Sequence, residues 1–298
     1  MLTFVAIAVD GLVYASWLFI VALGLTLIFG VMRILNVAHG GLYAVGAYTS
    51  AAMIGAYFRG GYPPALSYLL MLASAAVVGT FLGLLLERGL LRFFYQRDEV
   101  IIVLVTYAVF LMLEDAIRLI FGTDAYFAYQ PYSLLGNTQA GGLNFANYDL
   151  SLIGLAVVTG GALWWALNRT RMGMLLRVVI HDRDLALSMG INVARVFTVT
   201  FVSGAILGAM GGAFTAPMIS VTFGIGVEVI VLAFAVVVIG GMGSVPGAVL
   251  GALIVGLSRS AAVHLYAELE LFVIYGVMTL VLVFRPQGLF VRAAPRKI

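Results

Sequence analysis

The chain of 298 residues contains no cysteine and only three histidines. Without cysteine it has no disulfide framework, no thiolate metal site and no cysteine nucleophile. The histidines stand at positions 39, 181 and 264, too scattered in the sequence to suggest a metal cluster. We therefore expect no metal, no cofactor and no catalytic centre in this chain.

Charged residues are also few. Asp, Glu, Lys and Arg make up 10% of the chain, whereas a soluble domain carries about 25%. Hydrophobic residues reach 63%, and the mean hydropathy is +1.12. A surface that faces water cannot be built from so few charges, so the chain is not a soluble globule. The only lysine is Lys297, and no G-x-x-x-x-G-K-[ST] motif occurs, so ATP is not bound by a P-loop.

Long apolar runs are abundant instead. A hydrocarbon core of about 30 Å needs about 20 helical residues, and nine segments approach this length. They fall near residues 12–32, 37–58, 63–86, 100–121, 149–168, 196–218, 227–242, 246–263 and 269–285. The sequence predicts an all-α, polytopic transmembrane bundle of eight or nine spans, which forms one domain over residues 1–298.

One part of this topology is open to two interpretations. Residues 229–257 are apolar except around the stretch GGMGSVPG. They form either two full spans with a tight turn, which we favour, or two half-helices of a re-entrant element. Both return the chain to the same side, so the remaining topology is unaffected.

The basic residues predict the orientation. If the C-terminus is cytoplasmic, 13 of the 16 basic residues fall on that side, as the positive-inside rule requires. We therefore expect the N-terminus outside and the C-terminus inside. The connection 169–195 is then cytoplasmic, and the aromatic, nearly uncharged connection 122–148 is periplasmic. The outer connection is either a plain interfacial loop or a docking surface.

The junction of the first two segments is the main candidate for a substrate path. Asn36 and His39 stand beside Gly40, Gly41 and Tyr43. Asparagine is a good N-cap, and the N–H groups at a helix start attract a carboxylate. Broken helices at transporter substrate sites use this arrangement. The alternative is that Asn36 and His39 only satisfy backbone groups in a tight turn.

Other polar and small residues extend the candidate path. Glu228 is placed at the outer mouth of the seventh segment, and Gly240, Gly241 and Gly243 are placed at a backbone-flexing point. Most of the remaining charges within or beside spans lie near predicted span ends, and Glu114 and Arg118, four residues apart, can pair on one helix face. These charges are Asp10, Glu114, Asp115, Arg118 and Arg259.

Two series of glycines are spaced four residues apart. One comprises Gly204, Gly208 and Gly212, and the other comprises Gly243, Gly247 and Gly251. Small residues at this spacing let helices approach closely in lipid. We expect close packing within the subunit, although a subunit interface or a substrate path uses the same pattern.

The connection 169–195 predicts a short helix over residues 177–190. Val178, Asp182, Leu185 and Met189 fall on one helical face, and Gly190 marks the end of the helix. Such a helix lies on the inner membrane surface or sits in the groove of a cytoplasmic partner. Composition does not choose between these two.

Several motifs occur together in the order typical of one family. ILNVAHGGLYAVGAY (34–48) resembles the NFAHG…Y…GAY signature of permease subunits of branched-chain amino-acid ABC transporters. The segment from Arg171 through MGIN (189–192) to Arg195 is similar to their cytoplasmic element. Glycines 204–212 with Pro217, VVIGGMGSVPGAVLGALIVG (237–256) and FRPQGLF (284–290) resemble the rest of the pattern.

The resemblance implies a transport subunit, not an enzyme, in a bacterial cytoplasmic (inner) membrane. It implies a second, homologous permease subunit, two cytoplasmic ATPase subunits that bind ATP and Mg, and a periplasmic substrate-binding protein. The lipid bilayer is the remaining partner, and no nucleic acid is implied. The connection 169–195 then holds the helix that couples to an ATPase, with Arg171, Arg177, Asp182, Leu185, Met189 and Gly190 as its key residues.

The sequence departs from the family pattern at two places. Val37 replaces the usual phenylalanine of the first motif, and residues 177–182 (RVVIHD) replace a stretch rich in arginine and alanine. Related permeases carry urea or short amides, so these substrates remain open beside leucine, isoleucine and valine. A stand-alone secondary transporter or channel is the alternative from another class, but it would be expected to show more intramembrane acids.

Overall fold

The computed structural model describes residues 2–290, apart from the side chains of Ala140, Arg183 and Leu271. The basic tail formed by Arg292, Arg296 and Lys297 lies outside these residues. The long helices of this part are α1 (Leu2–Met32), α2 (Ala38–Arg59), α3 (Ser67–Gly89), α4 (Glu99–Phe121), α6 (Asn147–Arg169), α9 (Val193–Thr215), α10 (Ile225–Gly240), α11 (Val245–Leu265) and α12 (Glu270–Phe284). The prediction of an all-α polytopic bundle is confirmed.

Six of the described helical segments are long and apolar enough to cross a membrane: α1, α3 with its flanking turns, α4, α6, α9 and α11. The others are shorter or less apolar; α10 has 16 residues and α12 has 15, which is about 24 and 22 Å of helix. The number of crossings and the orientation stay predictions.

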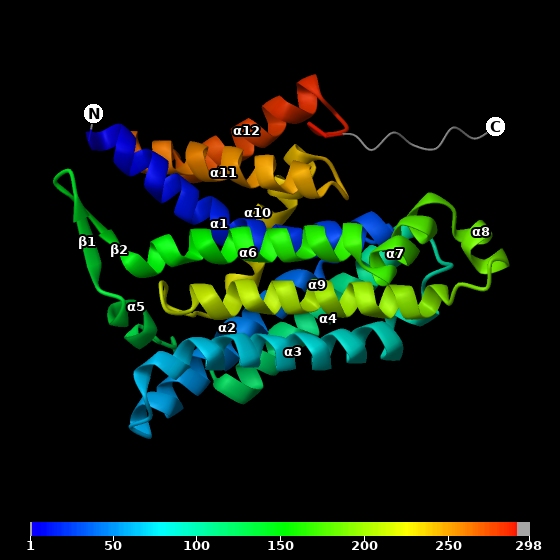
Figure 1. Cartoon of the computed structure of the whole chain (residues 1–298), viewed down its shortest axis with the longest axis horizontal. Helices are drawn as coiled ribbons and strands as arrows, with labels where there is room; N and C mark the ends of the chain where they lie inside the picture. Colours follow the sequence, from blue (N-terminus) through cyan, green and yellow to red (C-terminus); the bar gives the residue numbers. More distant parts are fainter. Residues whose placement is uncertain (1, 291–298) are drawn as a thin grey trace.

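The long helices lie roughly along one axis, which gives the bundle two ends (Figure 1). We call them the hairpin end, where α1 begins and the short hairpin β1–β2 lies, and the α8 end, where α7 (Arg171–His181) and α8 (Arg183–Ser188) lie. Helix α1 runs through the centre, and 83% of its apolar window is buried. An apolar helix without a polar face is typical of such a position.

The first helix is longer than the sequence predicts. It begins at Leu2, not near residue 12, because Asp10 does not interrupt it. The Asp10 carboxylate instead lies 2.7 Å from Nε2 of His264, near the end of α11. A partly exposed contact with a histidine of the neighbouring helix thus accommodates the Asp10 carboxylate within α1.

Helix α2 starts beside the middle of α1. Nε2 of His39 donates a hydrogen bond of 2.9 Å to the carbonyl of Val21, which lies eleven residues before the end of α1. Those eleven residues span about 16 Å. The non-helical residues 33–37 lead the chain back over this distance, from the end of α1 to the start of α2. The six extended steps between Met32 and Ala38, of about 3.3 Å each, are long enough for this. Arg33 makes the reversal with a φ of 57°.

Helix α10 also starts inside the bundle. Its second residue, Gly226, packs against Gly40 in the first turn of α2; a Cβ atom at Gly226 would lie 2.9 Å from the Gly40 carbonyl oxygen. The preceding segment, 216–224, pairs with the α4–α5 connection through Tyr126 and Val221. The first turns of α2 and α10 therefore meet in the interior, an arrangement that hydropathy did not predict.

Glycines let α9 pack closely against three helices. Gly204 lies against Ile28 of α1, Gly208 against the His39 ring and Gly212 against the Tyr43 backbone. Gly79 and Gly83 of α3, also four residues apart, face the α9 backbone at Ile206 and Val202. The sequence analysis did not single out this last pair. Close backbone approach of this kind is typical of helices in lipid.

The connection 122–148 is partly ordered by hydrogen bonds. It contains α5 (Gln130–Leu134) and the antiparallel strands β1 (Asn137–Ala140) and β2 (Leu143–Ala146), paired from Asn137–Ala146 to Ala140–Leu143. The Tyr132 hydroxyl donates to Oδ2 of Asp149 at 3.0 Å. Burial, together with the charge of Asp149, raises the pKa of Tyr132 to about 12, so this hydroxyl stays protonated at neutral pH.

Candidate substrate path and coupling surface

Asn36 and His39 are both completely buried at the α1–α2 junction. The side chain of Asn36 does not cap α2; the N-cap residue is Val37, and it has no side-chain capping bond. Within the described residues neither amide atom of Asn36 has a hydrogen-bond partner, and Nδ1 of His39 also lacks one. Buried polar groups are almost always paired, so these atoms are exceptions among the described residues.

Thr106 of α4 satisfies the non-helical backbone beside Asn36. Its hydroxyl accepts from the amide of Val37 at 3.2 Å and faces the carbonyl of Leu35 at 3.3 Å. Irregular backbone at membrane depth is tolerated only where protein or a cavity covers it. Thr106 was not singled out from the sequence, because a lone threonine in an apolar run carries no signal.

The ring of His39 fills a space bounded by two glycines, Gly24 of α1 and Gly208 of α9. We expect His39→Ala to lower the free energy of unfolding by about 2–4 kcal/mol, because it leaves a cavity between three helices. Thermal unfolding in detergent measures this, with His181→Ala at the exposed end of α7 as the matched control. Equal unfolding midpoints for the two variants would contradict a packing role for His39.

The predicted path residues fall in two places. Gly40, Gly41 and Tyr43 occupy the first turns of α2 beside α10 and α4, with Glu228 exposed in the first turn of α10. Gly240, Gly241 and Gly243 form the α10–α11 turn at the α8 end. There Gly240 crosses Gly247, Gly251 packs on the Val236 carbonyl, and Gly243 packs on Gly30. Residues 289–290 donate amide hydrogen bonds to the last α10 carbonyls.

The pair that the spacing of Glu114 and Arg118 allows is absent from the described ion pairs. Glu114 is buried instead, and its carboxylate lies against Gly226 at the start of α10. A negative side chain at a helix N-terminus is favourable because the helix dipole is positive there. The tertiary contact with α10 therefore takes the place of the local pair.

A cavity of about 270 Å³ lies between the α10–α11 turn and the connection 169–195, here called the coupling segment. Gly243 and Ser244 line one side of it, and Arg177 and Ile180 of α7 line another. From the sequence, Gly243 was predicted to lie on the substrate path and Arg177 to take part in ATPase coupling. The structure brings these two groups to one cavity at the α8 end.

The coupling segment is two helices, so the prediction of one helix over 177–190 is wrong. Asp182 lies between α7 and α8, and its Oδ1 accepts from the amides of Asp184 and Leu185, both at 2.9 Å. It therefore acts as the N-cap of α8. The single face predicted for Val178, Asp182, Leu185 and Met189 is broken at this point.

The predicted stop at Gly190 is confirmed. Gly190 has a φ of 76°, its amide donates to the carbonyl of Leu187, and the amide of Ile191 donates to the carbonyl of Ala186. These two bonds form the Schellman motif. Between the two caps, α8 exposes Leu185 and Leu187, and Met189 follows exposed at its end.

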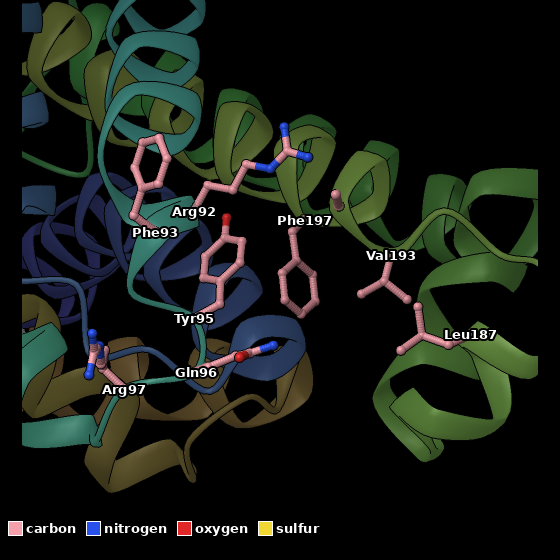
Figure 2. Close-up of a pocket in the computed structure, with 9 residues that line it drawn as sticks. Arg92, Phe93, Tyr95, Gln96, Arg97, Leu187, Val193 and Phe197 are labelled. Carbon is pink, nitrogen blue, oxygen red and sulfur yellow. The ribbon is translucent and has the colours of Figure 1, made fainter.

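A second cavity, of about 510 Å³, separates α8 from the connection between α3 and α4. In Figure 2 the rings of Tyr95 and Phe197 lie next to each other, Arg92 reaches over them, and Leu187 of α8 lies across the cavity from them. The rings are nearly perpendicular, with centroids 5.1 Å apart. This pocket was not predicted from the sequence, because its walls come from two stretches of the chain, 92–97 and 187–197, that are about 90 residues apart.

Glu87, at the end of α3, is a buried acid that the sequence analysis also missed. Its carboxylate accepts hydrogen bonds from Tyr95 at 2.6 Å and from Thr198 of α9 at 2.7 Å. Glu87 lies towards the α8 end and Glu114 towards the hairpin end, so the two do not form a chain of acids. The bonds fix the α3–α4 connection against α9, beside the 510 Å³ cavity.

These features define a multi-pass helical membrane protein with interrupted helices in its interior and a short capped helix pair at one end. Residues 7–282 match the family described as "Branched-chain amino acid transport system / permease component". The chain belongs to this family of transport permeases. The family predicted from the motifs is thereby confirmed.

Individual relatives match over nearly the whole chain. The branched-chain amino acid permease protein BraD of Pseudomonas aeruginosa is 27% identical, covering 97% of this chain and 96% of its own length. LivH of Escherichia coli is 26% identical, with coverage of 97% and 96%. LivM of the same organism is 28% identical, covering 93% of this chain and 68% of LivM. No solved structure matches the chain.

Proposed function

We propose that this chain is a permease subunit of an ATP-driven importer for leucine, isoleucine and valine in the bacterial cytoplasmic membrane. The match to the permease family over residues 7–282 is the observation that carries the proposal. The relatives BraD and LivH are named for high-affinity branched-chain amino acid transport. The chain itself is a transport component, and ATP and Mg are bound by separate ATPase subunits.

The proposed assembly has a second permease, two cytoplasmic ATPases and a periplasmic binding protein. A second permease is supported by the similarity of this chain to both LivH and LivM, two proteins of one organism. The ATPases are supported by α8, whose exposed Leu185 and Leu187 at a basic end of the bundle suit an apolar groove of a cytoplasmic partner. The connection 122–148 is the proposed contact for the binding protein.

The proposed mechanism is alternating access. Closure of the ATPases moves α8, and the move reaches α7 because the two helices share Asp182 as a boundary residue. Arg177 of α7 and the Gly243 turn line one cavity, so a shift of α7 reaches the α10–α11 turn. The first turns of α2 and α10, which meet in the interior, then move relative to each other. The substrate path thereby opens to the other side of the membrane.

Reconstitution tests the proposal. The five-component complex in proteoliposomes should take up leucine only with ATP and loaded binding protein, and excess isoleucine or valine should compete. If labelled urea or acetamide is taken up and excess leucine does not reduce that uptake, the substrate belongs instead to the urea and short-amide class. Uptake by this chain alone, driven by an ion gradient, would contradict an ATP-driven importer and favour a secondary transporter.

A further inference from the structure

Charged and aromatic side chains from four helices gather around Tyr14 of α1. Arg259 of α11 forms an ion pair with Glu270, the first residue of α12. The guanidinium of Arg259 lies 4.1 Å from the centre of the Tyr14 ring. Glu228 of α10 and Tyr275 of α12 lie within electrostatic range of the Tyr14 hydroxyl. This group of five residues is here called the Arg259 cluster.

The Arg259 cluster lies at the level of the middle of α1. Trp17 is the central residue of this 31-residue helix, and its ring packs edge-on against Tyr14 with centroids 4.9 Å apart. On its other side Trp17 lies 6.4 Å from the ring of Tyr43 in α2. The Tyr43 hydroxyl is 2.6 Å from that of Thr215. A row of aromatic rings thus connects the Arg259 cluster with the buried start of α2.

The charges of the Arg259 cluster remain accessible at the surface of this chain. The side chains of Arg259 and Glu270 are 29% and 33% exposed, and Glu228 is exposed beside apolar Val227 and Val231. A charge that faces lipid within the hydrocarbon core is costly, so charged residues of membrane-spanning helices usually face a water-filled path or another subunit.

We propose that Arg259, Glu270 and Glu228 bind the charged ends of a zwitterionic amino acid as it passes along this face. The site rests on the proposed function, because it assumes an amino acid as cargo. Arginine offers a planar fork of N–H donors that matches a carboxylate, and the two glutamates accept from the ammonium group. An amino acid that inserts between Arg259 and Glu270 replaces one ion pair by two, so no charge is left unpaired.

Aromatic and aliphatic side chains lie near the proposed site. The rings of Tyr14 and Trp17 pack edge-on in α1, and Val227 and Val231 are exposed on α10 within a turn of Glu228. Burial of such a side chain is favourable by about 25 cal/mol per Å² of apolar surface. The site therefore selects a zwitterion with an apolar side chain, whereas urea and short amides lack the two charges that would separate Arg259 from Glu270.

The Arg259–Glu270 ion pair has a simpler explanation, which is that it holds α12 against α11. The first experiment distinguishes this structural role from substrate binding. Leucine uptake by the assembled complex is measured for Arg259→Gln, Glu270→Gln and the exchange Arg259→Glu with Glu270→Arg. Hydrogen bonds to charged groups contribute about 1.5–3 kcal/mol, so each single variant should lower uptake about tenfold or more. The exchange should restore thermal stability but not uptake, because the carboxylate and ammonium sites are reversed. Full recovery of uptake in the exchange variant would overturn the site.

The absence of native cysteine permits a direct second experiment. Tyr275→Cys places one thiol in the Arg259 cluster, and Tyr62→Cys at the exposed α2–α3 turn is the control. In the assembled complex, leucine should slow labelling of the thiol at position 275 by a membrane-impermeant maleimide several-fold. Isoamylamine, which has the leucine side chain but no carboxylate, should not. Labelling at position 62 should be the same in all conditions.

Two outcomes of this experiment would overturn the site. One is labelling at position 275 that leucine does not change, and the other is no labelling there in any condition, because the proposal requires water on this face. Failure of the proposed function is distinct from both. If the unmodified complex imports no branched-chain amino acid, the function is wrong; if it imports leucine and leucine gives no protection, only the site is wrong.

Discussion

Gly212→Leu is expected to prevent the bundle from forming. A side chain at this position of α9 would overlap the backbone of Tyr43 and lie close to the Ala47 amide in α2. Backbone atoms within a helix cannot move aside as a flexible side chain can, and overpacking of a tight core costs about 1–3 kcal/mol, occasionally more. We expect the upper part of this range or beyond, and a protein that protease degrades after detergent extraction.

Gly154→Leu is the matched control, because Gly154 is an exposed glycine of α6 with no atom within 4 Å of its added Cβ. This variant should accumulate and resist protease as the unmodified chain does. Gly212→Ala adds only one carbon and should give an intermediate loss. If Gly212→Leu and Gly154→Leu were equally stable, the close approach of α2 and α9 would not be what stabilises the interior.

Disruption of the caps of α8 is expected to separate ATP hydrolysis from uptake. Asp182→Ala removes two hydrogen bonds at the N-terminus of α8, a loss of about 1 kcal/mol. Gly190→Val forces a β-branched residue into a left-handed backbone conformation, which costs about 1–2 kcal/mol. Neither position lies in the interior, so the permease should still fold and assemble. Leucine uptake should fall about fivefold for a loss of about 1 kcal/mol and about thirtyfold for a loss of about 2 kcal/mol, because about 1.4 kcal/mol corresponds to a factor of ten.

Asp184→Ala tests whether the effect belongs to the caps. Asp184 lies on the same short helix and is exposed, and its backbone, not its carboxylate, provides the hydrogen bonds there. Its uptake should equal that of the unmodified complex, with ATP hydrolysis measured in parallel. Normal uptake in both Asp182→Ala and Gly190→Val complexes that assemble fully would show that the α7–α8 boundary does not transmit movement.

Local signals in the sequence predicted most of the elements. The ends of α4, α6 and α11 fall within about three residues of the predicted segments, because a run of apolar residues and its polar boundary are properties of one short stretch. The stop at Gly190 was predicted for the same reason. Asp10 and Asp182 were misjudged because a charge was weighed without its tertiary or capping partner, His264 in the first case and the amides of α8 in the second.

The candidate sites required more than local signals. Asn36, His39 and Gly40 attracted attention as polar and small residues at a span boundary, and the structure places them at a helix start inside the bundle. Glu228 was assigned to the candidate path from its place at the outer mouth of a span, and Arg259 was noted only as a charge near a span end. Their closeness to Tyr14 and Glu270 could not be predicted, because it depends on how four helices are rotated and how deep each one lies. Helices that are apolar on every face have no hydrophobic periodicity from which rotation or depth can be inferred.

By itself, the sequence determined the class of this protein: a helical membrane permease, its apolar segments and its family, because composition, run length and motif order are readable along one chain. Only the tertiary structure decided where in the bundle α2 and α10 begin, which acidic side chains are buried and which charged side chains lie next to each other. The reason is physical: a reversal such as 33–37 or 216–224 is stabilised by contacts from elsewhere in the chain, Thr106 for the first and Tyr126 for the second.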